Sequence, residues 1–400
     1  MKRILIFAVA YHPFVGGAEI ALKEITDRFD PNEYSFDMIT LRFDSNLPKV
    51  EKFGNVTVHR IGFTARSPKI SDRTMPLKCK IAKALFPFTS FSKALLLNRT
   101  NRYDIVWALM ANQAGFGALF FKWLHPDIPY FLELQDGRAF AEMKTRQPIL
   151  RMLWPLYRTI YLKADRIKTI SRYIANEVRS IGYSKKLEVI PNAVDVAKFS
   201  ALIPEERLVE LKMRFGKEKG DVFLFTASRL VLSRGVEDVI EALIHLPENV
   251  KLLIAGDGED REKLEHIASG LEVSDRVIFA GHVDHAQLPT YLRISDIFVR
   301  PSLIEGLGNS FLEAMAAGIP IIGTPVGGIP DFLTDKVTGL FCEVRNPQSI
   351  TKAVNTYIQD PVLVARIVGN ARELISGHYE WDKIAGDMKK RVFEPLLKRG

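Results

Sequence analysis

The sequence is poor in cysteine: it has two, Cys79 and Cys342, and they lie far apart in the chain. Two isolated thiols form neither a disulfide framework nor a cluster of metal ligands, so we expect two buried thiols in a protein of the reducing cytoplasm. An Asp-x-Asp sequence and a cluster of histidines are also lacking. Their lack argues against a required metal ion, and no cofactor is expected.

Long apolar runs are missing as well. No stretch approaches the roughly twenty apolar residues that a transmembrane helix needs, so we expect that the chain does not span a bilayer. The apolar run at 4–10 follows Lys2 and Arg3 and therefore resembles the start of a signal peptide. It is short, however, and continues into Tyr11 and His12 instead of a cleavage site, which predicts a buried first strand.

Acidic residues are scarce in one segment. Between 66 and 102 the chain has nine lysines and arginines, one acid, and many interleaved leucines and phenylalanines. The net charge of +8 also favours an anionic partner. The segment is typical of a surface that binds an anionic membrane, here the inner face of the cytoplasmic membrane, or of a helix pair with a solvated basic face and an apolar face in the core. Nucleic acid is not expected as a partner, because no binding motif accompanies the charge.

Short strand-like runs alternate with helical patterns along the 400 residues, which is the signature of parallel α/β architecture. The pattern breaks at 191–199 and then restarts. We therefore expect two Rossmann-like, doubly wound domains, 1–195 and 196–379, facing each other across a cleft at the carboxyl ends of their strands. The expected strands are 3–10, 35–41, 56–61, 104–110, 129–135, 166–171 and 187–191, and then 222–228, 251–256, 276–280, 297–300, 320–323 and 339–344.

The most informative motif is the segment 300–320, in which Glu305 and Glu313 flank the start of a predicted helix inside an apolar run. Asn309 or Ser310 can cap this helix, and its free backbone N–H groups attract a phosphate or diphosphate. Glu313 lies about one turn further on, where it can accept hydrogen bonds from hydroxyls beside the phosphate. Each glutamate alone is equally well explained by the helix macrodipole, which favours acids near a helix start.

Two further loops follow predicted strands. Gly16 and Gly17 come just before a helix start, where the lack of a Cβ lets the backbone approach a ligand. A tight turn explains such a pair equally well. Arg229 and Arg234 follow the strand at 222–228, and their guanidinium groups suit a phosphate. Surface charge at a strand end is the alternative.

The spacing of Glu305 and Glu313 resembles the Glu-x7-Glu signature of retaining glycosyltransferases of family 4, which have the GT-B fold and use nucleotide-sugar donors. The resemblance implies that Glu313 holds the donor ribose and that Glu305 lies beside the sugar being transferred. It also implies that a C-terminal helix at about 380–400 packs back on the first domain.

The other loops resemble the same family. The glycine loop there faces the donor diphosphate, and the arginine pair resembles a diphosphate clamp in which Arg234 replaces the usual lysine, a planar fork in place of a compact charge. Main-chain groups near His282 and Val283 correspond to those that meet the nucleobase. The implied donor-binding residues are Gly16, Gly17, Arg229, Arg234, His282, Val283, Glu305, Gly306, Leu307, Gly308, Asn309, Ser310 and Glu313.

The acceptor side departs from the family pattern. Many members have His-Asp after the strand corresponding to 129–135, whereas this chain has Gln135 and Asp136. Gln135 cannot act as an acid or a base. Asp136 can orient a sugar hydroxyl or accept its proton, although capping is an equally ordinary role for an aspartate. The implied catalytic residues are Glu305, Arg229, Arg234 and Asp136.

The resemblance therefore implies an enzyme: a hexosyltransferase that moves a sugar from a nucleoside diphosphate sugar, with a UDP-sugar favoured, to a glycan or lipid-linked acceptor. It implies retention of the anomeric configuration and a role in synthesis of cell-envelope polysaccharide such as lipopolysaccharide. Two alternatives stay open. One is a nucleotide-sugar epimerase of related fold, and the other is a non-catalytic nucleotide-sugar-binding assembly protein, which the change at Gln135 favours.

Overall fold

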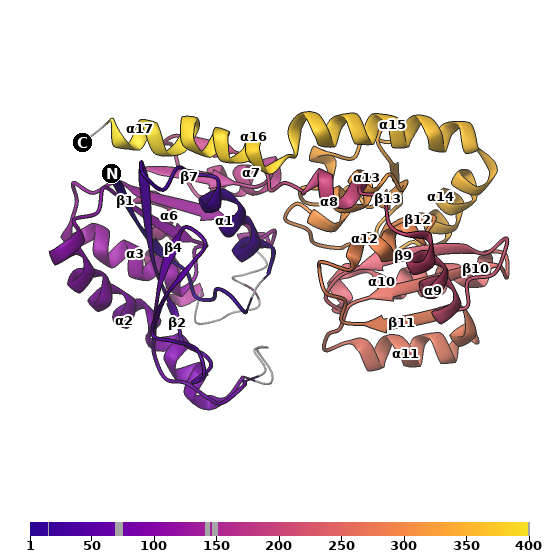
Figure 1. The fold of residues 1–400 in the computed structure, drawn as a ribbon, viewed down its shortest axis with the longest axis horizontal. Helices are drawn as coiled ribbons and strands as arrows, with labels where there is room; N and C mark the ends of the chain where they lie inside the picture. The colour runs from indigo at the N-terminus through magenta and orange to yellow at the C-terminus, as the bar shows by residue number, and fades with distance from the viewer. Residues whose placement is uncertain (15, 69–74, 141–144, 146–150, 399–400) are drawn as a thin grey trace. The chain divides into compact units, whose positions relative to one another are not determined.

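A computed structural model describes residues 1–14, 16–68, 75–140, 145 and 151–398. The chain divides into two compact units, one formed by Met1–Asn192 with Trp381–Gly400 and the other by Ala193–Glu380. Each unit is an α/β structure built on one sheet, with helices packed on it (Figure 1).

The sheet of the first unit has eight strands in the order β3-β4-β2-β1-β5-β6-β7-β8. Neighbouring strands are parallel except for β3, which pairs antiparallel with β4 at the edge. β3 was not predicted, because its Val-Glu-Lys-Phe sequence buries no side chain and forms no apolar run. The strands are β1 (Lys2–Phe7), β2 (Tyr34–Leu41), β3 (Val50–Phe53), β4 (Val56–Ile61), β5 (Ile105–Leu109), β6 (Tyr130–Leu134), β7 (Arg166–Thr169) and β8 (Leu187–Val189).

The central strands of this sheet are continuous apolar runs, because helices leave little of either face in contact with water. Every residue of β5 and β6 is buried, including one charged side chain, that of Glu133. The basic segment between 66 and 102 contains one long helix, α2, instead of the helix pair considered above; Lys69, Asp72 and Arg73 lie outside the described residues. Before residue 192, the helices that the described residues form are α1 (Gly17–Asp27), α2 (Leu77–Asn101), α3 (Gln113–Leu124), α6 (Trp154–Leu162) and α7 (Arg172–Ser180).

The last helical segment belongs to the first unit, although it follows the second in sequence (Figure 1, yellow). Phe393 is fully buried among the rings of Phe29, Trp107 and Phe131, at centroid distances of 5.3, 5.5 and 5.8 Å. These aromatic contacts hold the end of the chain on the first sheet. The segment consists of α16 (Trp381–Met388), a π-helical turn (Lys389–Phe393) and α17 (Glu394–Leu397).

The sheet of the second unit has six parallel strands in the order β11-β10-β9-β12-β13-β14. All the strands expected from the sequence are present in both units, and most end one to three residues earlier than expected. The strands are β9 (Val222–Ala227), β10 (Val250–Ala255), β11 (Val277–Gly281), β12 (Ile297–Arg300), β13 (Ile321–Gly323) and β14 (Leu340–Phe341).

Helices of the second unit bury their apolar faces against this sheet in a core of leucine, isoleucine and valine. Cys342 is part of that core, and burial raises the pKa of its thiol to about 12. Cys79 is also a buried free thiol, as expected. Across the described residues, no helix has the length and apolarity needed to cross a membrane. The helices are α8 (Val196–Ser200), α9 (Glu205–Arg214), α10 (Val236–Ala242), α11 (Arg261–Gly270), α12 (Leu288–Arg293), α13 (Asn309–Ala317), α14 (Pro347–Gln359) and α15 (Pro361–His378).

Candidate functional site

The second sheet has a topological switch point between β9 and β12. From β9 the chain adds β10 and β11 on one side and then returns to place β12 on the other. Open parallel sheets bind ligands outside the carboxyl ends of their strands at such a point. The loop after β9 carries Arg229 and Arg234, and the loop after β12 carries Glu305. The two loops are joined by a hydrogen bond of 2.9 Å from Leu303 N to Ser233 O.

The Glu305 carboxylate is buried between two guanidinium groups. Its Oε2 atom accepts hydrogen bonds from Arg300 Nη2 at 2.7 Å and from Arg234 Nη1 at 2.8 Å, and its Oε1 atom accepts one from Gly306 N at 3.2 Å. Burial lowers the pKa of Arg300 to about 10, an effect that Glu305 opposes, so this guanidinium stays charged at neutral pH. Two cations around one anion leave one positive charge in excess. Arg300 was not among the residues predicted for the site.

Close backbone contacts fix the conformation of the loop at Glu305. Its carbonyl oxygen accepts a hydrogen bond from Gly328 N at 3.2 Å. A Cβ atom at Gly327 would lie 1.8 Å from the same oxygen, and the φ of Gly327 is +54°. Only glycine fits both the space and the backbone conformation at this position.

The expected helix start after this loop is present as α13, but its cap differs from the prediction. Gly308, with φ of +100°, is the N-cap residue, and no side chain caps the helix. Asn309 and Ser310 were the expected caps, yet both lie inside the helix, where Ser310 Oγ accepts a hydrogen bond from Arg300 Nη1. Both are half-buried. The buried residues of the preceding turn are Gly306, Leu307 and Gly308.

Glu313, on the same helix, is bound by a histidine that the sequence analysis did not single out. Its Oε1 atom lies 2.9 Å from His285 Nε2, and Lys198 Nζ lies 2.9 Å from Nδ1 of the same ring. Lys198 belongs to α8, and His285 to the loop between β11 and α12. His285 is 28 positions from Glu313 and 87 from Lys198, so no local pattern connects the three residues.

The remaining residues predicted to bind the donor are mostly exposed. Arg229 is exposed, and within the described part of the chain its side chain has no ion-pair partner. His282 is exposed and Val283 half-buried after β11. Gly16 and Gly17 are exposed at the start of α1 in the first unit. Among the described residues, no group of three His, Cys, Asp or Glu side chains is placed to hold a metal ion.

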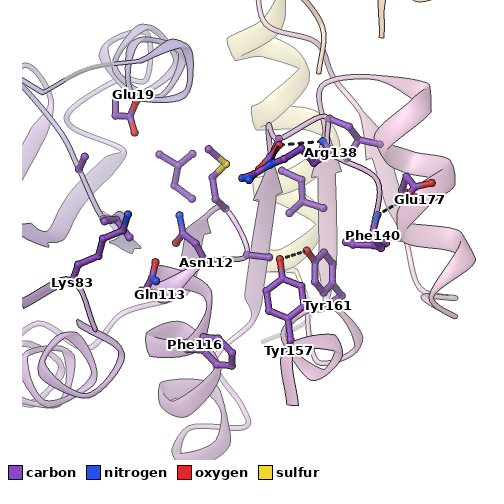
Figure 2. A pocket seen from close by; sticks show the side chains of 18 of the residues that line it. Glu19, Lys83, Asn112, Gln113, Phe116, Arg138, Phe140, Tyr157, Tyr161 and Glu177 are labelled. Atoms are coloured by element: carbon purple, nitrogen blue, oxygen red, sulfur yellow. Dashed lines mark hydrogen bonds and ion pairs between the residues drawn. The ribbon is translucent and has the colours of Figure 1, made fainter. Parts of the chain in front are cut away.

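The first sheet has its own switch point, between β1 and β5, and a pocket of about 480 Å³ lies at the carboxyl ends of these strands (Figure 2). Figure 2 shows Phe116, Tyr157 and Tyr161 on one side of the pocket, and the two tyrosine hydroxyls are 3.0 Å apart. Glu19 lies across from them, and burial raises the pKa of its carboxyl. Apolar walls with a few polar groups are typical of small-molecule sites.

Asp136 lines this pocket, but its carboxylate is already paired. Arg138 Nε donates to its two oxygens at 3.1 and 2.9 Å, and Arg138 N donates to Oδ1 at 3.1 Å. Gln135 does not line the pocket. Its Nε2 atom donates to Glu133 Oε1 at 2.8 Å, and its Oε1 atom accepts from Asn192 Nδ2 at 2.9 Å.

Comparison with known proteins agrees with this architecture. Residues 15–198 match the model of Glycosyltransferase Family 4, and residues 210–374 match that of Glycosyl transferases group 1. The chain belongs to the family 4 glycosyltransferases. Over 379 residues this glycosyltransferase is 27% identical to an uncharacterized glycosyltransferase of Methanocaldococcus jannaschii, covering 93% of this chain and 92% of that one.

Two further relatives are informative. The chain is 32% identical over 229 residues to the GDP-mannose-dependent alpha-(1-6)-phosphatidylinositol monomannoside mannosyltransferase of Mycolicibacterium smegmatis, covering 54% of this chain and 59% of the relative. The crystal structure of Anabaena HepE in complex with UDP and glucose superposes with a TM-score of 0.76 at 18% identity, covering 98% and 100% of the two chains. The fold is therefore GT-B, as predicted.

Replacing Glu305 by alanine is expected to lower the free energy of unfolding by about 3–5 kcal/mol, because buried Arg300 then lacks its anion. Urea denaturation followed by circular dichroism measures this change. Glu313→Ala is the matched control, with an expected loss below about 1 kcal/mol because its partner His285 is partly exposed. Equal losses in the two variants would show that the Glu305 pair does not stabilise this loop.

Proposed function

We propose that this glycosyltransferase moves a sugar from a nucleoside diphosphate sugar to an acceptor hydroxyl and retains the anomeric configuration. The observation that carries the proposal is the excess positive charge at the switch point of the second sheet. Arg234 and Arg300 surround Glu305 there, at the N-terminal end of α13, and exposed Arg229 follows the neighbouring strand.

The charge arrangement suits a departing diphosphate. As the bond between the anomeric carbon and the phosphate oxygen breaks, negative charge grows on the diphosphate. Arg234, held by Glu305 and the Ile304 carbonyl, and the backbone N–H groups at the start of α13 are fixed donors that stabilise this charge without reorganising, and exposed Arg229 adds a further cation. Asn309 and Ser310 are the partly exposed residues of that helix start, so we assign the diphosphate to them and to the two arginines.

Glu305 serves this reaction by its charge. Both of its oxygens already accept hydrogen bonds, and two of the donors are cations. These bonds stabilise the ionised carboxylate and weaken it as a nucleophile, which supports an electrostatic role beside the cation-like sugar. In the reaction we propose, the acceptor oxygen bonds to the anomeric carbon on the face that the diphosphate leaves, and the acceptor proton passes to the departing phosphate oxygen.

The pocket of the first unit is our candidate for the acceptor. Its aromatic wall suits the apolar face of a sugar ring, and the Asp136–Arg138 pair offers both an acceptor and donors of hydrogen bonds for hydroxyls (Figure 2). Asp136 therefore acts, in this proposal, as part of an ion pair that orients the acceptor.

A lipid-linked acceptor is supported by the surface beside this pocket. Leu77, Ile81, Leu85 and Phe88 form an apolar stripe on α2, and each is more than 40% exposed. Phe116, in the pocket wall, contacts Phe120, which stacks on Phe88 and lies against exposed Trp123 of α3. Exposed lysines flank the stripe at 78 and 80. We propose that this α2–α3 surface rests on an anionic membrane and delivers a lipid-linked glycan of the cell envelope to the pocket.

We propose a UDP-sugar as the donor, a choice that the UDP complex of the Anabaena neighbour supports. The GDP-mannose dependence of the mycobacterial relative makes GDP the decisive comparison. Thermal denaturation with UDP, GDP and ADP tests this, because a ligand at about 100 times its dissociation constant adds about 2.7 kcal/mol of stability. Stabilisation by UDP alone is the expected result, and a larger effect of GDP would reassign the donor.

Activity assays beside these binding measurements separate the alternatives. Nucleotide binding without transfer to any acceptor would identify an assembly protein, and conversion of the sugar without an acceptor would identify an epimerase.

Arg229→Ala is expected to lower kcat/KM by about two orders of magnitude, on the order of 3 kcal/mol of transition-state stabilisation, because a cationic donor to the diphosphate is lost. Stability should not change, since Arg229 is exposed and pairs with no described residue. Steady-state kinetics with the identified nucleotide sugar provide the test. Arg366→Ala removes an exposed arginine of α15 and controls for net charge. Equal activity of both variants would remove Arg229 from the mechanism.

Replacing Lys78 and Lys80 together by glutamine is expected to weaken binding to anionic vesicles by about 2 kcal/mol, roughly thirtyfold, because each cation near the surface contributes about 1 kcal/mol. Cosedimentation with phosphatidylserine and phosphatidylcholine vesicles measures the effect. The control replaces exposed Lys219 and Lys263 of the second unit. Equal recovery of the unsubstituted chain with both vesicle types would contradict a membrane-binding surface.

A further inference from the structure

Three side chains, those of Lys198, His285 and Glu313, form a hydrogen-bonded triad. Lys198 Nζ lies 2.9 Å from His285 Nδ1, and His285 Nε2 lies 2.9 Å from Glu313 Oε1. The Glu313 side chain is 13% exposed and the His285 side chain 44%. The carboxylate is therefore mostly enclosed, while the imidazole can be reached from solvent.

Lys198 and Glu313, on either side of the imidazole, determine which ring nitrogen donates and which accepts. A lysine ammonium has only hydrogen atoms to donate, and an ionised carboxylate can only accept. Nδ1 must therefore accept from Lys198, and Nε2 must carry the proton that it donates to Glu313. With Nδ1 accepting and Nε2 donating, both ring nitrogens are in use.

Packing holds the ring in this orientation. The aromatic ring of Phe199, which is 1% exposed, lies 5.5 Å from the imidazole centroid in an edge-on arrangement. Phe199 and Lys198 both belong to α8, which packs against α13. One short helix thus supplies both the hydrogen-bond donor and the packing surface for His285.

The hydrogen bond to His285 also limits where the Glu313 carboxylate can turn. Glu313 is close enough to Arg300 to affect the pKa of that guanidinium, so the cationic cluster around Glu305 attracts this second carboxylate too. A Glu313 side chain that swung toward the cluster would neutralise the charge offered to a diphosphate. The bond from His285 engages Oε1 and leaves Oε2 able to accept a hydroxyl.

We propose that His285, oriented by Lys198, is a positioning residue that aims the Glu313 carboxylate at the two ribose hydroxyls of the donor nucleotide. The inference rests on the proposed function, which places the ribose at Glu313. His285 itself touches no reacting atom in this scheme. Its effect is on donor affinity, and the rate of transfer from the bound donor is unaffected.

The test is isothermal titration of the full chain and its variants with UDP, GDP and ADP. His285→Ala should weaken the best nucleotide by about tenfold, the typical worth of one hydrogen bond to a charged group. Glu313→Ala should weaken it at least as much, and adding His285→Ala to Glu313→Ala should cause no further loss, because the two residues act through one carboxylate. His266→Ala, on the surface of α11, is the matched control and should bind as the unsubstituted chain does.

His285→Gln distinguishes positioning from simple packing. A glutamine amide carries an N–H donor and a carbonyl acceptor on one carbon, as the imidazole carries its two nitrogens, so it can accept from Lys198 and donate to Glu313. We expect this variant to recover affinity to within about threefold, and in kinetic assays we expect His285→Ala to raise the donor KM without changing kcat.

The outcomes separate the assignment of the donor nucleotide from the positioning role of His285. If none of the three nucleotides binds the unsubstituted chain, the donor assignment fails and this inference with it. If Glu313→Ala loses affinity while His285→Ala does not, the ribose assignment stands and the role of His285 is wrong. Failure of His285→Gln to recover affinity, when that variant is as stable as the unsubstituted chain, would also overturn the role.

Discussion

The second unit depends on one buried carboxylate, that of Glu305, and on the two guanidinium groups that hold it. An ionised carboxylate in an apolar loop is strongly unfavourable unless charges and hydrogen bonds compensate for the lost water. Arg300 comes from the end of β12 and Arg234 from the loop after β9, so their shared anion ties the two strand ends together. Arg300 also donates to Ser310 and so fixes the start of α13. The contacts that stabilise these loops are therefore the ones that gather positive charge at the start of α13, where Asn309 and Ser310 are half-buried.

The candidate site of each unit lies at the same topological feature. In each sheet the chain begins near the middle, adds strands to one side and then returns to the other, which leaves two neighbouring loops diverging from the carboxyl edge. In the second unit, the ion pairs of Glu305 with Arg234 and Arg300 join the two loops, which carry an excess of positive charge. In the first they leave a pocket lined with rings and amides. One fold pattern thus carries two different sets of loop residues on similar strands, and we propose a different ligand for each set.

The sequence was sufficient for features that depend on local pattern and insufficient for those made by distant residues. Apolar runs located all the expected strands, and the Glu305–Glu313 segment located the helix and the loop before it. The exposed edge strand β3 has no apolar run and was missed. Gly308 caps α13 in place of the expected side chains, and Ser310 instead accepts from Arg300, a contact that depends on how β12 meets the helix. His285 and Lys198 were missed for the same reason, since only the folded chain brings them to Glu313.

The hydrogen bonds of Gln135 give a physical reason for a glutamine at the position where many family members have histidine. Lys168 and Glu133 are fully buried, with Nζ and Oε1 2.6 Å apart, and Gln135 joins the same carboxylate oxygen to Asn192. An amide donates at one end and accepts at the other at every pH, whereas an imidazole in this place would titrate near neutrality beside a buried ion pair. Gln135 therefore suits a structural link that must not change its charge. Because Gln135 does not line the acceptor pocket, this link leaves the groups of the pocket, Asp136 among them, unchanged, and in the proposed same-face reaction the acceptor proton passes to the departing phosphate.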